Sequence, residues 1–290
     1  MKERIKNGRG KLCLIISAFV YGLAPILAKV TYSGGAGAVT LAFLRAFLTV
    51  PLLFILMKVN NIPLRLTKKE MKSVTVLGIF GGAVPIILLY LSYGHISTGL
   101  ATTLHFIYPV VIVFASAFIY HERIRYTTII ASLLVTVGIF MFVDINNSSD
   151  RIGIILALLS GVFYSFYVLY MDKSGLDGMD YIKLTFYTMI IISISTLIFG
   201  VIVHGISFEM TTKAWIYALL ISVLVTLLAM PLFQAGVKYE GASTAGILST
   251  LEPITTMILG AVFLGEFIGI MQYIGGLLIL SGVAAVQMYR

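Results

Sequence analysis

Residues 242–267 read ASTAGILSTLEPITTMILGAVFLGEF, and this stretch decides the fold of the chain. It is long and apolar enough to cross a bilayer, which takes about 20 apolar residues in a helix. It carries one carboxylate, Glu252, directly before Pro253, and it closes on Gly265-Glu266. An ionisable side chain at such a depth is costly, so this stretch is a candidate functional region.

A second stretch has the same plan. Residues 98–124 read TGLATTLHFIYPVVIVFASAFIYHERI, with Pro109 followed 13 positions later by Glu122. Pro253 and Glu266 are also 13 positions apart, and the two prolines are separated by 144 positions. A pattern that occurs twice at one offset predicts a duplicated membrane unit.

The composition excludes an ordinary soluble domain. Hydrophobic residues fill 59% of the 290 positions, charged residues fill 11%, and the mean hydropathy is +1.03. Unpaired backbone groups are costly in lipid, so the long apolar runs must be helices. We predict ten membrane spans, at 11–31, 36–58, 71–93, 97–119, 124–143, 152–173, 180–204, 211–235, 242–264 and 268–288.

The basic residues predict the orientation. Sixteen of the twenty Lys and Arg residues lie before the first span, after the last one, or next to the loops that follow even-numbered spans. The positive-inside rule therefore places both termini in the cytoplasm of a multi-pass protein of the cell membrane. Most basic residues lie on one side of the predicted membrane, as membrane orientation requires, so the net charge of +8 does not indicate a nucleic-acid partner.

The chain divides into two halves of five spans each. We predict a first repeat at 11–143, a polar linker at 144–151 and a second repeat at 152–288. Because five is odd, the halves insert with opposite orientation. An inverted repeat of this kind places its interface, and any site built there, near the middle of the bilayer.

The paired motifs identify a family resemblance. Tyr108-Pro109 with Glu122, and Leu251-Glu252-Pro253 with Gly265-Glu266, resemble the EamA domain of the drug/metabolite transporter superfamily. The resemblance covers essentially the whole chain. It implies an all-α polytopic membrane protein with ten helices, arranged as two inverted five-helix repeats around a central cavity. It also implies alternating access without a nucleotide-binding domain or cofactor.

Members of this superfamily move amino acids, nucleotide sugars, other metabolites or cationic drugs. This chain carries His105-Phe106-Ile107-Tyr108 where the first copy usually has small or apolar residues before its proline. That departure leaves the substrate open.

Two ionisable residues near the middle of the membrane are the first site candidates. Glu252 is a candidate proton or cation site that faces the cavity, or else a structural carboxylate beside the helix broken at Pro253. His105 could donate to a substrate or pair with Glu252 across the repeat interface. Its alternative role is a structural hydrogen bond between helices.

Arg45 is the most costly charge in the predicted spans. It could bind an anionic group through two hydrogen bonds. The second span is peripheral in the family that the chain resembles, so we favour a structural pairing of Arg45 with helix carbonyls or a carboxylate.

Further candidates line the spans that the resemblance places around the cavity. Aromatic hydroxyl side chains could stack on an apolar or cationic substrate, although tyrosine is also ordinary packing material. Gln234 could line the inner mouth, while Pro109, Glu122, Pro253 and Glu266 are expected to be structural. The tyrosines are Tyr21, Tyr90, Tyr93, Tyr164 and Tyr167.

These features predict a secondary transporter that exports or exchanges a small organic metabolite, such as an amino acid or drug-like compound. Coupling to protons through Glu252 and uncoupled exchange both stay open. Alternatives are a flippase for a lipid-linked sugar and a non-transporting membrane scaffold or sensor. An enzyme is disfavoured because HERIR at 121–125 fails the H-E-x-x-H pattern and no cluster has metal-ligand spacing. The expected partners are a small-molecule substrate and the bilayer, with the chain a monomer or homodimer.

Overall fold

The computed structural model describes residues 8–92, 95–96, 98–121, 124–141, 151–264 and 269–288. Within these ranges the chain is helical, with short turns between helices and no strand. The predicted linker lies outside the described residues except for Arg151, where the second half begins.

The first half forms helices from α1 to α9, one of them interrupted by a π-helical segment, η1. They are α1 (Arg9–Tyr21), α2 (Ala24–Ser33), α3 (Ala38–Phe47), α4 (Thr49–Val59), α5 (Lys68–Val76), η1 (Leu77–Ala83), α6 (Val84–Ser92), α7 (Thr98–His105), α8 (Tyr108–Phe118) and α9 (Tyr126–Phe140).

The second half repeats this order and has a π-helical segment of its own, η4. Its elements are α10 (Arg151–Lys173), η3 (Leu176–Gly178), α11 (Tyr181–Ile202), α12 (Thr212–Ile221), η4 (Ser222–Ala229), α13 (Met230–Glu240), α14 (Ala242–Leu248), α15 (Leu251–Leu264) and α16 (Ile270–Met288).

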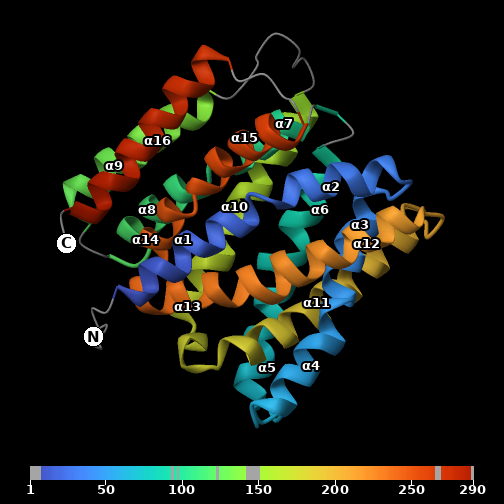
Figure 1. Cartoon of the computed structure of the whole chain (residues 1–290). Helices are drawn as coiled ribbons and strands as arrows, with labels where there is room; N and C mark the ends of the chain where they lie inside the picture. The colour runs from blue at the N-terminus through green and yellow to red at the C-terminus, as the bar shows by residue number, and fades with distance from the viewer. Residues whose placement is uncertain are drawn as a thin grey trace.

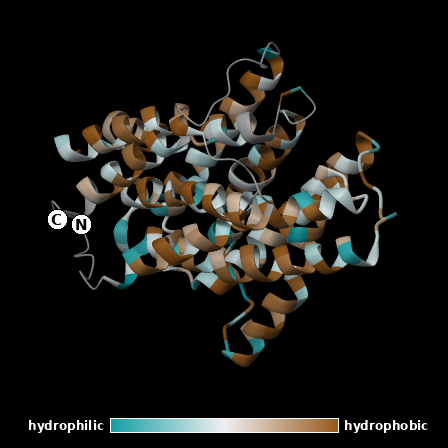
Figure 2. Cartoon of the chain, turned by 45° about the horizontal axis from the view of Figure 1, so that its top comes forward, coloured by the Kyte–Doolittle hydropathy of each residue, from teal (hydrophilic) through white to brown (hydrophobic). Residues whose placement is uncertain are grey.

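The described part of the chain holds eight continuous or bent helices that are long and apolar enough to cross a membrane. Two further apolar helices, Tyr126–Phe140 and Tyr273–Ala285, are shorter. The helical membrane architecture is therefore present, while the full count of ten spans stays a prediction. Figure 2 shows hydrophobic colour along most of the helices, as expected for surfaces that face lipid.

Prolines interrupt four of the spans at the same relative position. The α-helix stops or turns four residues before each proline, because proline lacks the N–H that would bond that carbonyl and its ring clashes with it. The four pairs are Tyr21 with Pro25, Phe47 with Pro51, His105 with Pro109, and Ser249 with Pro253.

Two other prolines follow π-helical segments. Residues of η1 end two positions before Pro85, and those of η4 end two positions before Pro231. A π-helical turn changes the backbone hydrogen-bonding pattern next to the proline, which cannot donate a hydrogen bond. Such segments mark bends in a helix. The disruptions therefore fall at matching places in both halves.

Helices of the two halves pack against each other throughout the bundle (Figure 1). In the described contacts α1 lies along α13, α10 along α6, α11 along α3, and α14 along α8. The interface between the repeats is thus the centre of the molecule. The start of α1 and the end of α16 lie on the same side in both Figure 1 and Figure 2.

The α9–α16 pair packs closely at the edge of the bundle (Figure 1). A Cβ atom added to Gly138 would lie 2.6 Å from the carbonyl oxygen of Gly275, and one added to Gly282 would lie 2.8 Å from that of Ala131. Small residues let the two backbones approach, which is how membrane helices gain packing contacts.

Candidate functional site

The candidate site forms where the interrupted helices meet α10. A Cβ atom added to Gly161 of α10 would lie 2.5 Å from the carbonyl oxygen of His105. That carbonyl stands four residues before Pro109, so no α-helical N–H can reach it. The glycine lets α10 approach the joint between α7 and α8, which brings the side chains around it together.

Four aromatic rings form one continuous cluster at this joint. The ring centroids of Tyr108 and Tyr164 are 4.8 Å apart in an edge-to-face arrangement, and those of His105 and Tyr164 are 5.3 Å apart. Tyr164 also stacks on Tyr167 at 5.8 Å. Such geometries are favourable for aromatic pairs and give a rigid apolar surface with hydroxyl groups at its edge. We call His105, Tyr108, Tyr164 and Tyr167 the aromatic cluster.

Hydrogen bonds join the aromatic cluster across the two repeats. His105 Nδ1 lies 2.8 Å from Ser160 Oγ, and Tyr108 Oη lies 2.5 Å from Ser249 Oγ. Because the Ser160 and Ser249 hydroxyls donate to helix carbonyls, His105 and Tyr108 act as the donors. His105 therefore makes a hydrogen bond between helices with Ser160, and its pairing with Glu252 stays a prediction.

Glu252 lies in the first turn of α15, in the interior of the helix bundle. Its carboxylate interacts electrostatically with Arg45, Tyr21, Tyr108 and Tyr164, which come from four different helices. Among the residues that the structure describes, no side chain donates a hydrogen bond to it, and the residue is half-buried. A carboxylate inside a helix bundle without such a donor is a candidate functional group.

Arg45 lies in the last turn of α3 and is half-buried. Its charge acts on both Tyr21 and Glu252, so it belongs to the same central region as the aromatic cluster. The structural pairing that we favoured from the sequence does not occur in the described part of the chain, where Arg45 has no hydrogen bond or ion-pair partner.

Tyr21 stands at the joint between α1 and α2, next to Glu252. Thr256 Oγ1 of α15 donates to the carbonyl oxygen of Gly22 at 3.0 Å. The Tyr21 ring meets Phe233 of α13 edge-on at 6.4 Å, and the residue is half-buried. The first joint is thereby fixed beside the start of α15.

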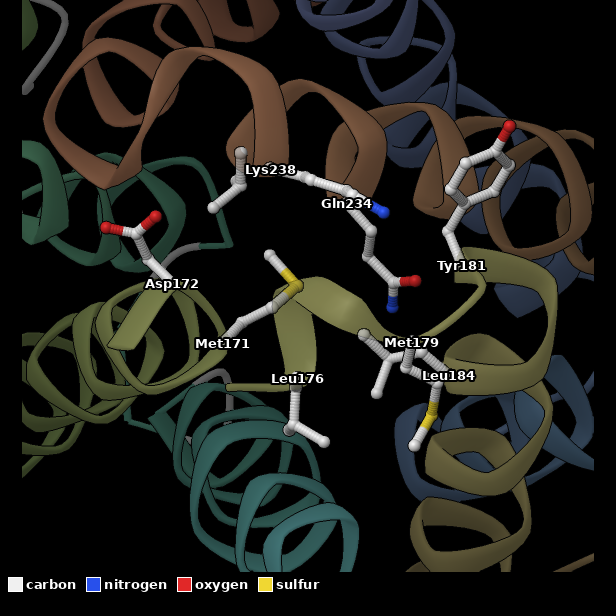
Figure 3. A pocket seen from close by; sticks show the side chains of 9 residues that line it. Met171, Asp172, Leu176, Met179, Tyr181, Leu184, Gln234 and Lys238 are labelled. Carbon is white, nitrogen blue, oxygen red and sulfur yellow. The ribbon is translucent and has the colours of Figure 1, made fainter. Parts of the chain in front are cut away.

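Gln234 bonds to the aromatic cluster and also lines a small pocket, which Figure 3 shows. Its Nε2 donates to the hydroxyl of Tyr167 at 2.9 Å, and its Oε1 accepts from Thr185 at 2.9 Å. The pocket lies between the end of α10, the start of α11, and α13. Its walls are Met171, Asp172, Leu176, Met179, Tyr181, Leu184, Gln234, Val237 and Lys238. That Gln234 lines the inner mouth of the central cavity stays a prediction, and its position in the wall of this pocket supports that prediction.

Comparison with known proteins decides the family. The profile of the EamA-like transporter family matches residues 8–144 and again residues 151–288. The chain belongs to the EamA-like transporter family. This membership makes it a multi-pass membrane transporter and confirms the resemblance that the paired motifs indicated.

Relatives and a solved structure agree with this membership. An uncharacterized transporter of Archaeoglobus fulgidus is 23% identical over 274 residues, which cover 94% of each chain. The uncharacterized transporter YcbK of Bacillus subtilis is 25% identical over 277 residues, covering 92% of this chain and 88% of its own. A protein of known crystal structure superposes with a TM-score of 0.84 over 98% of both chains at 16% identity, which shows a shared fold.

The remaining sequence candidates are Tyr90 and three residues outside the described part of the chain. Tyr90 is half-buried on α6, which packs against α10. Tyr93, Glu122 and Glu266 lie outside the described residues. The EamA-like transporter therefore has its described candidates concentrated on α1, α3, α7, α8, α10, α13 and α15. Within that description, no group of His, Cys, Asp and Glu side chains could hold a metal ion.

The sequence candidates omitted several residues that complete the site. Tyr108, Ser160, Ser249 and Phe233 supply hydrogen bonds or ring contacts to the predicted residues. Tyr108 and Ser249 could have been found from the sequence, because Tyr108 directly precedes Pro109 and Ser249 lies four residues before Pro253, at the helix joints that these prolines define. Phe233 carried none, because an apolar ring in an apolar helix is indistinguishable from packing.

Proposed function

We propose that this EamA-like transporter is a secondary transporter that moves a small organic metabolite, such as an amino acid or drug-like compound, by alternating access between its two repeats. The observation that carries the proposal is a pair of half-buried charges at the repeat interface, Arg45 and Glu252, which make no hydrogen bond or ion pair in the described part of the chain. A packing seam would bury such charges with partners, whereas a substrate site keeps them available.

We propose ten spans with both termini in the cytoplasm and the plasma membrane as the location. The two shorter apolar helices, added to the eight long ones, would supply that number. The positions of the α1 start and the α16 end on one side of the bundle fit an even count (Figure 1). With this orientation the pocket beside Gln234 opens toward the cytoplasm.

The helix joints support a rocking motion. The span of α7 and α8 and the span of α14 and α15 are both broken before a proline, and the π-helical segments η1 and η4 occupy matching positions in the two halves. Interrupted helices near the middle of the membrane are typical of transporters in which one repeat moves against the other. We take export or exchange as the direction.

Glu252 is the proposed proton-coupling residue. The titratable or charged groups that face it are Arg45, Tyr21, Tyr108 and Tyr164. Protonation of the Glu252 carboxylate would leave the positive charge of Arg45 without a counter-charge. A proton and the substrate would therefore compete for binding to the Glu252 carboxylate. His105, held by Ser160, is proposed to orient the aromatic cluster and contact substrate rather than carry the proton.

The test is transport by the purified protein in proteoliposomes. A labelled panel of amino acids, amines, carboxylates and sugars is offered with and without an imposed pH gradient. We expect the wild type to accumulate at least one compound, and Glu252→Gln to lose the accumulation that the gradient drives. Glu209→Gln, which changes an exposed glutamate between α11 and α12, is the matched control and should behave as wild type. Absence of movement for every compound would refute the transporter proposal.

A flippase for lipid-linked sugars is the second candidate. A small pocket lies between the α7–α8 joint and α9, at the edge of the bundle, where a lipid-attached substrate would enter. It is lined by Thr103, Leu104, Phe106, Ile107, Thr136, Ile139 and Phe140. Translocation of a fluorescent polyprenyl-linked sugar in the same vesicles, without movement of the soluble panel, would favour this candidate.

A further inference from the structure

The connection between α4 and α5 lies at the surface of the membrane. One candidate span runs over Ala38–Val59 and the next over Lys68–Ser92, so residues 60–67 join the ends of two spans. The connection is at the lower edge of the bundle in Figure 1. Between positions 58 and 72 the chain carries five basic residues and one acidic residue. We call the five exposed basic side chains the basic surface: Lys58, Arg65, Lys68, Lys69 and Lys72.

The charges of the basic surface are not neutralised within the protein. No ion pair joins any of the five cations to a carboxylate in the ranges that the structure describes. The acidic residue of this segment, Glu70, accepts a hydrogen bond from the backbone N–H of Thr67 at 2.7 Å, as part of the capping box of α5. Like charges that crowd one surface repel each other, so the basic surface favours an anionic partner.

The start of α5 supports the same conclusion. Lys68 and Lys69 occupy the first turn of this helix, where the partial positive charge of the helix dipole favours acidic residues. Their charges therefore oppose the helix rather than stabilise it. An anion bound beside them would be attracted by the two ammonium groups and by the helix dipole together.

The second repeat holds the basic surface in place. Lys183 of α11 is buried, and its Nζ donates to the carbonyl oxygen of Arg65 at 2.6 Å. The hydroxyl of Tyr187 donates to the carbonyl oxygen of Leu64. Ile62 and Leu64 also pack on an apolar cluster formed by α3, α4 and α11. A partner that binds here therefore meets side chains on a fixed backbone, which lowers the entropic cost of binding.

Exposed apolar side chains border the basic surface. Val59, the last residue of α4, is 71% exposed, and Met71 of α5 is 48% exposed. The ammonium group of Lys58 lies 5.6 Å from the centre of the Phe54 ring, which is also exposed. Cations beside exposed apolar groups match a phospholipid, whose anionic headgroup is attached to apolar tails. A soluble anion would use the charges alone.

We propose that the basic surface binds the headgroups of anionic phospholipids, in the leaflet where α4 ends and α5 begins. With both termini in the cytoplasm, as proposed above, this is the inner leaflet. The basic surface is separate from the central site, so lipid binding there does not depend on which compound the protein transports.

The test compares tryptophan fluorescence at two ends of the protein. Trp215, the only tryptophan of the chain, lies in α12 near the far end of the span that contains Val59, since Thr211 N–H donates to the carbonyl oxygen of Gly34 at 2.9 Å. The double variant Val59→Trp/Trp215→Phe moves the tryptophan beside the basic surface. Each protein is reconstituted into phosphatidylcholine vesicles that contain increasing fractions of phosphatidylglycerol or phosphatidylcholine with brominated chains, and quenching gives the relative affinity for the two lipids.

We expect the double variant to prefer brominated phosphatidylglycerol by about fivefold, the effect of one basic residue near an anionic lipid surface. Adding Lys68→Gln and Lys69→Gln should reduce this preference to about twofold or less. Adding Lys68→Arg and Lys69→Arg instead keeps both charges and should retain it. The glutamine changes remove charges that oppose the helix dipole, so α5 should still form. Wild-type Trp215 should show a preference below about twofold.

Three results would overturn the proposal. The first is equal quenching by the two lipids in the double variant, and the second is a preference that the glutamine changes leave intact. The third is loss of the preference in inorganic phosphate but not in sodium chloride of equal ionic strength, which would show a site for soluble anions. Both leaflets have the same composition, so the orientation of the protein does not affect the result. No transport is measured, so failure here leaves the proposed function standing.

Discussion

Gly161→Ala is the sharpest test of how α10 builds the site. The added Cβ atom would lie 2.5 Å from the carbonyl oxygen of His105, which is 0.9 Å short of ordinary contact at 3.4 Å. The obstacle is backbone, so α10 must move away from the α7–α8 joint. A shift of that size would lengthen the bond between His105 and Ser160 from 2.8 Å to roughly 3.7 Å, beyond hydrogen-bond range.

The expected cost follows from these distances. Overpacking costs about 1–3 kcal/mol and the lost bond about 0.5–1.5 kcal/mol, offset by the about 0.5–1 kcal/mol by which alanine favours a helix over glycine. We expect a net loss of about 1–3 kcal/mol, measured as a lower midpoint of thermal unfolding in detergent, together with weaker transport.

A matched glycine supplies the control. A Cβ atom on Gly276 of α16 would meet only Met257 Cε, at 3.7 Å. Gly276→Ala should therefore be neutral or stabilising by up to about 1 kcal/mol. If Gly161→Ala and Gly276→Ala melt at the same temperature, the close approach of α10 to the joint is not what holds the site together.

Two further predictions concern stability. Gln234→Leu leaves the buried hydroxyl of Tyr167 without the donor that now bonds it, so unfolding should become easier by about 1–3 kcal/mol; an unchanged melting midpoint would contradict this. Thr67→Ala removes the side chain that accepts from Glu70 N–H in the capping box at the start of α5. It should cost about 1 kcal/mol, with Thr67→Ser close to wild type, and equal losses for the two variants would argue against the cap.

The prolines connect the fold to the site. Each of the four broken spans turns four residues before a proline, and the residues at three of those turns are Tyr21, His105 and Ser249. A helix break tilts the side chains on either side of it and removes a backbone donor. These three residues stand at the repeat interface, where each contacts a residue of another helix, whereas Phe47 at the fourth turn is exposed.

The membrane class, the duplication and the family could all be predicted from the sequence. Each depends on local features that the chain carries in order: apolar runs of fixed length, basic residues at their ends, and one proline-glutamate spacing repeated at a constant offset. Glu252 could be found in the same way, because a carboxylate inside an apolar run is conspicuous wherever the chain folds. The candidate tyrosines on α1 and α10 followed from their positions on the predicted spans.

The pairing of these residues was decided only by the tertiary structure. From the sequence, His105 could have reached Glu252 or Ser160. It bonds Ser160 because α10 lies close to the α7–α8 joint, and Gly161, in the second half of the chain, permits that close approach. Arg45 could have acted on any neighbouring group, and the packing of α3 against α11 and η4 brings its charge within electrostatic range of Glu252. The sequence determined which ionisable side chains enter the membrane, because the free-energy cost of placing such a side chain there depends on the residue type and its depth. Which of them face one another depends on helix rotation and contact distance, and these arise only when the two repeats pack together.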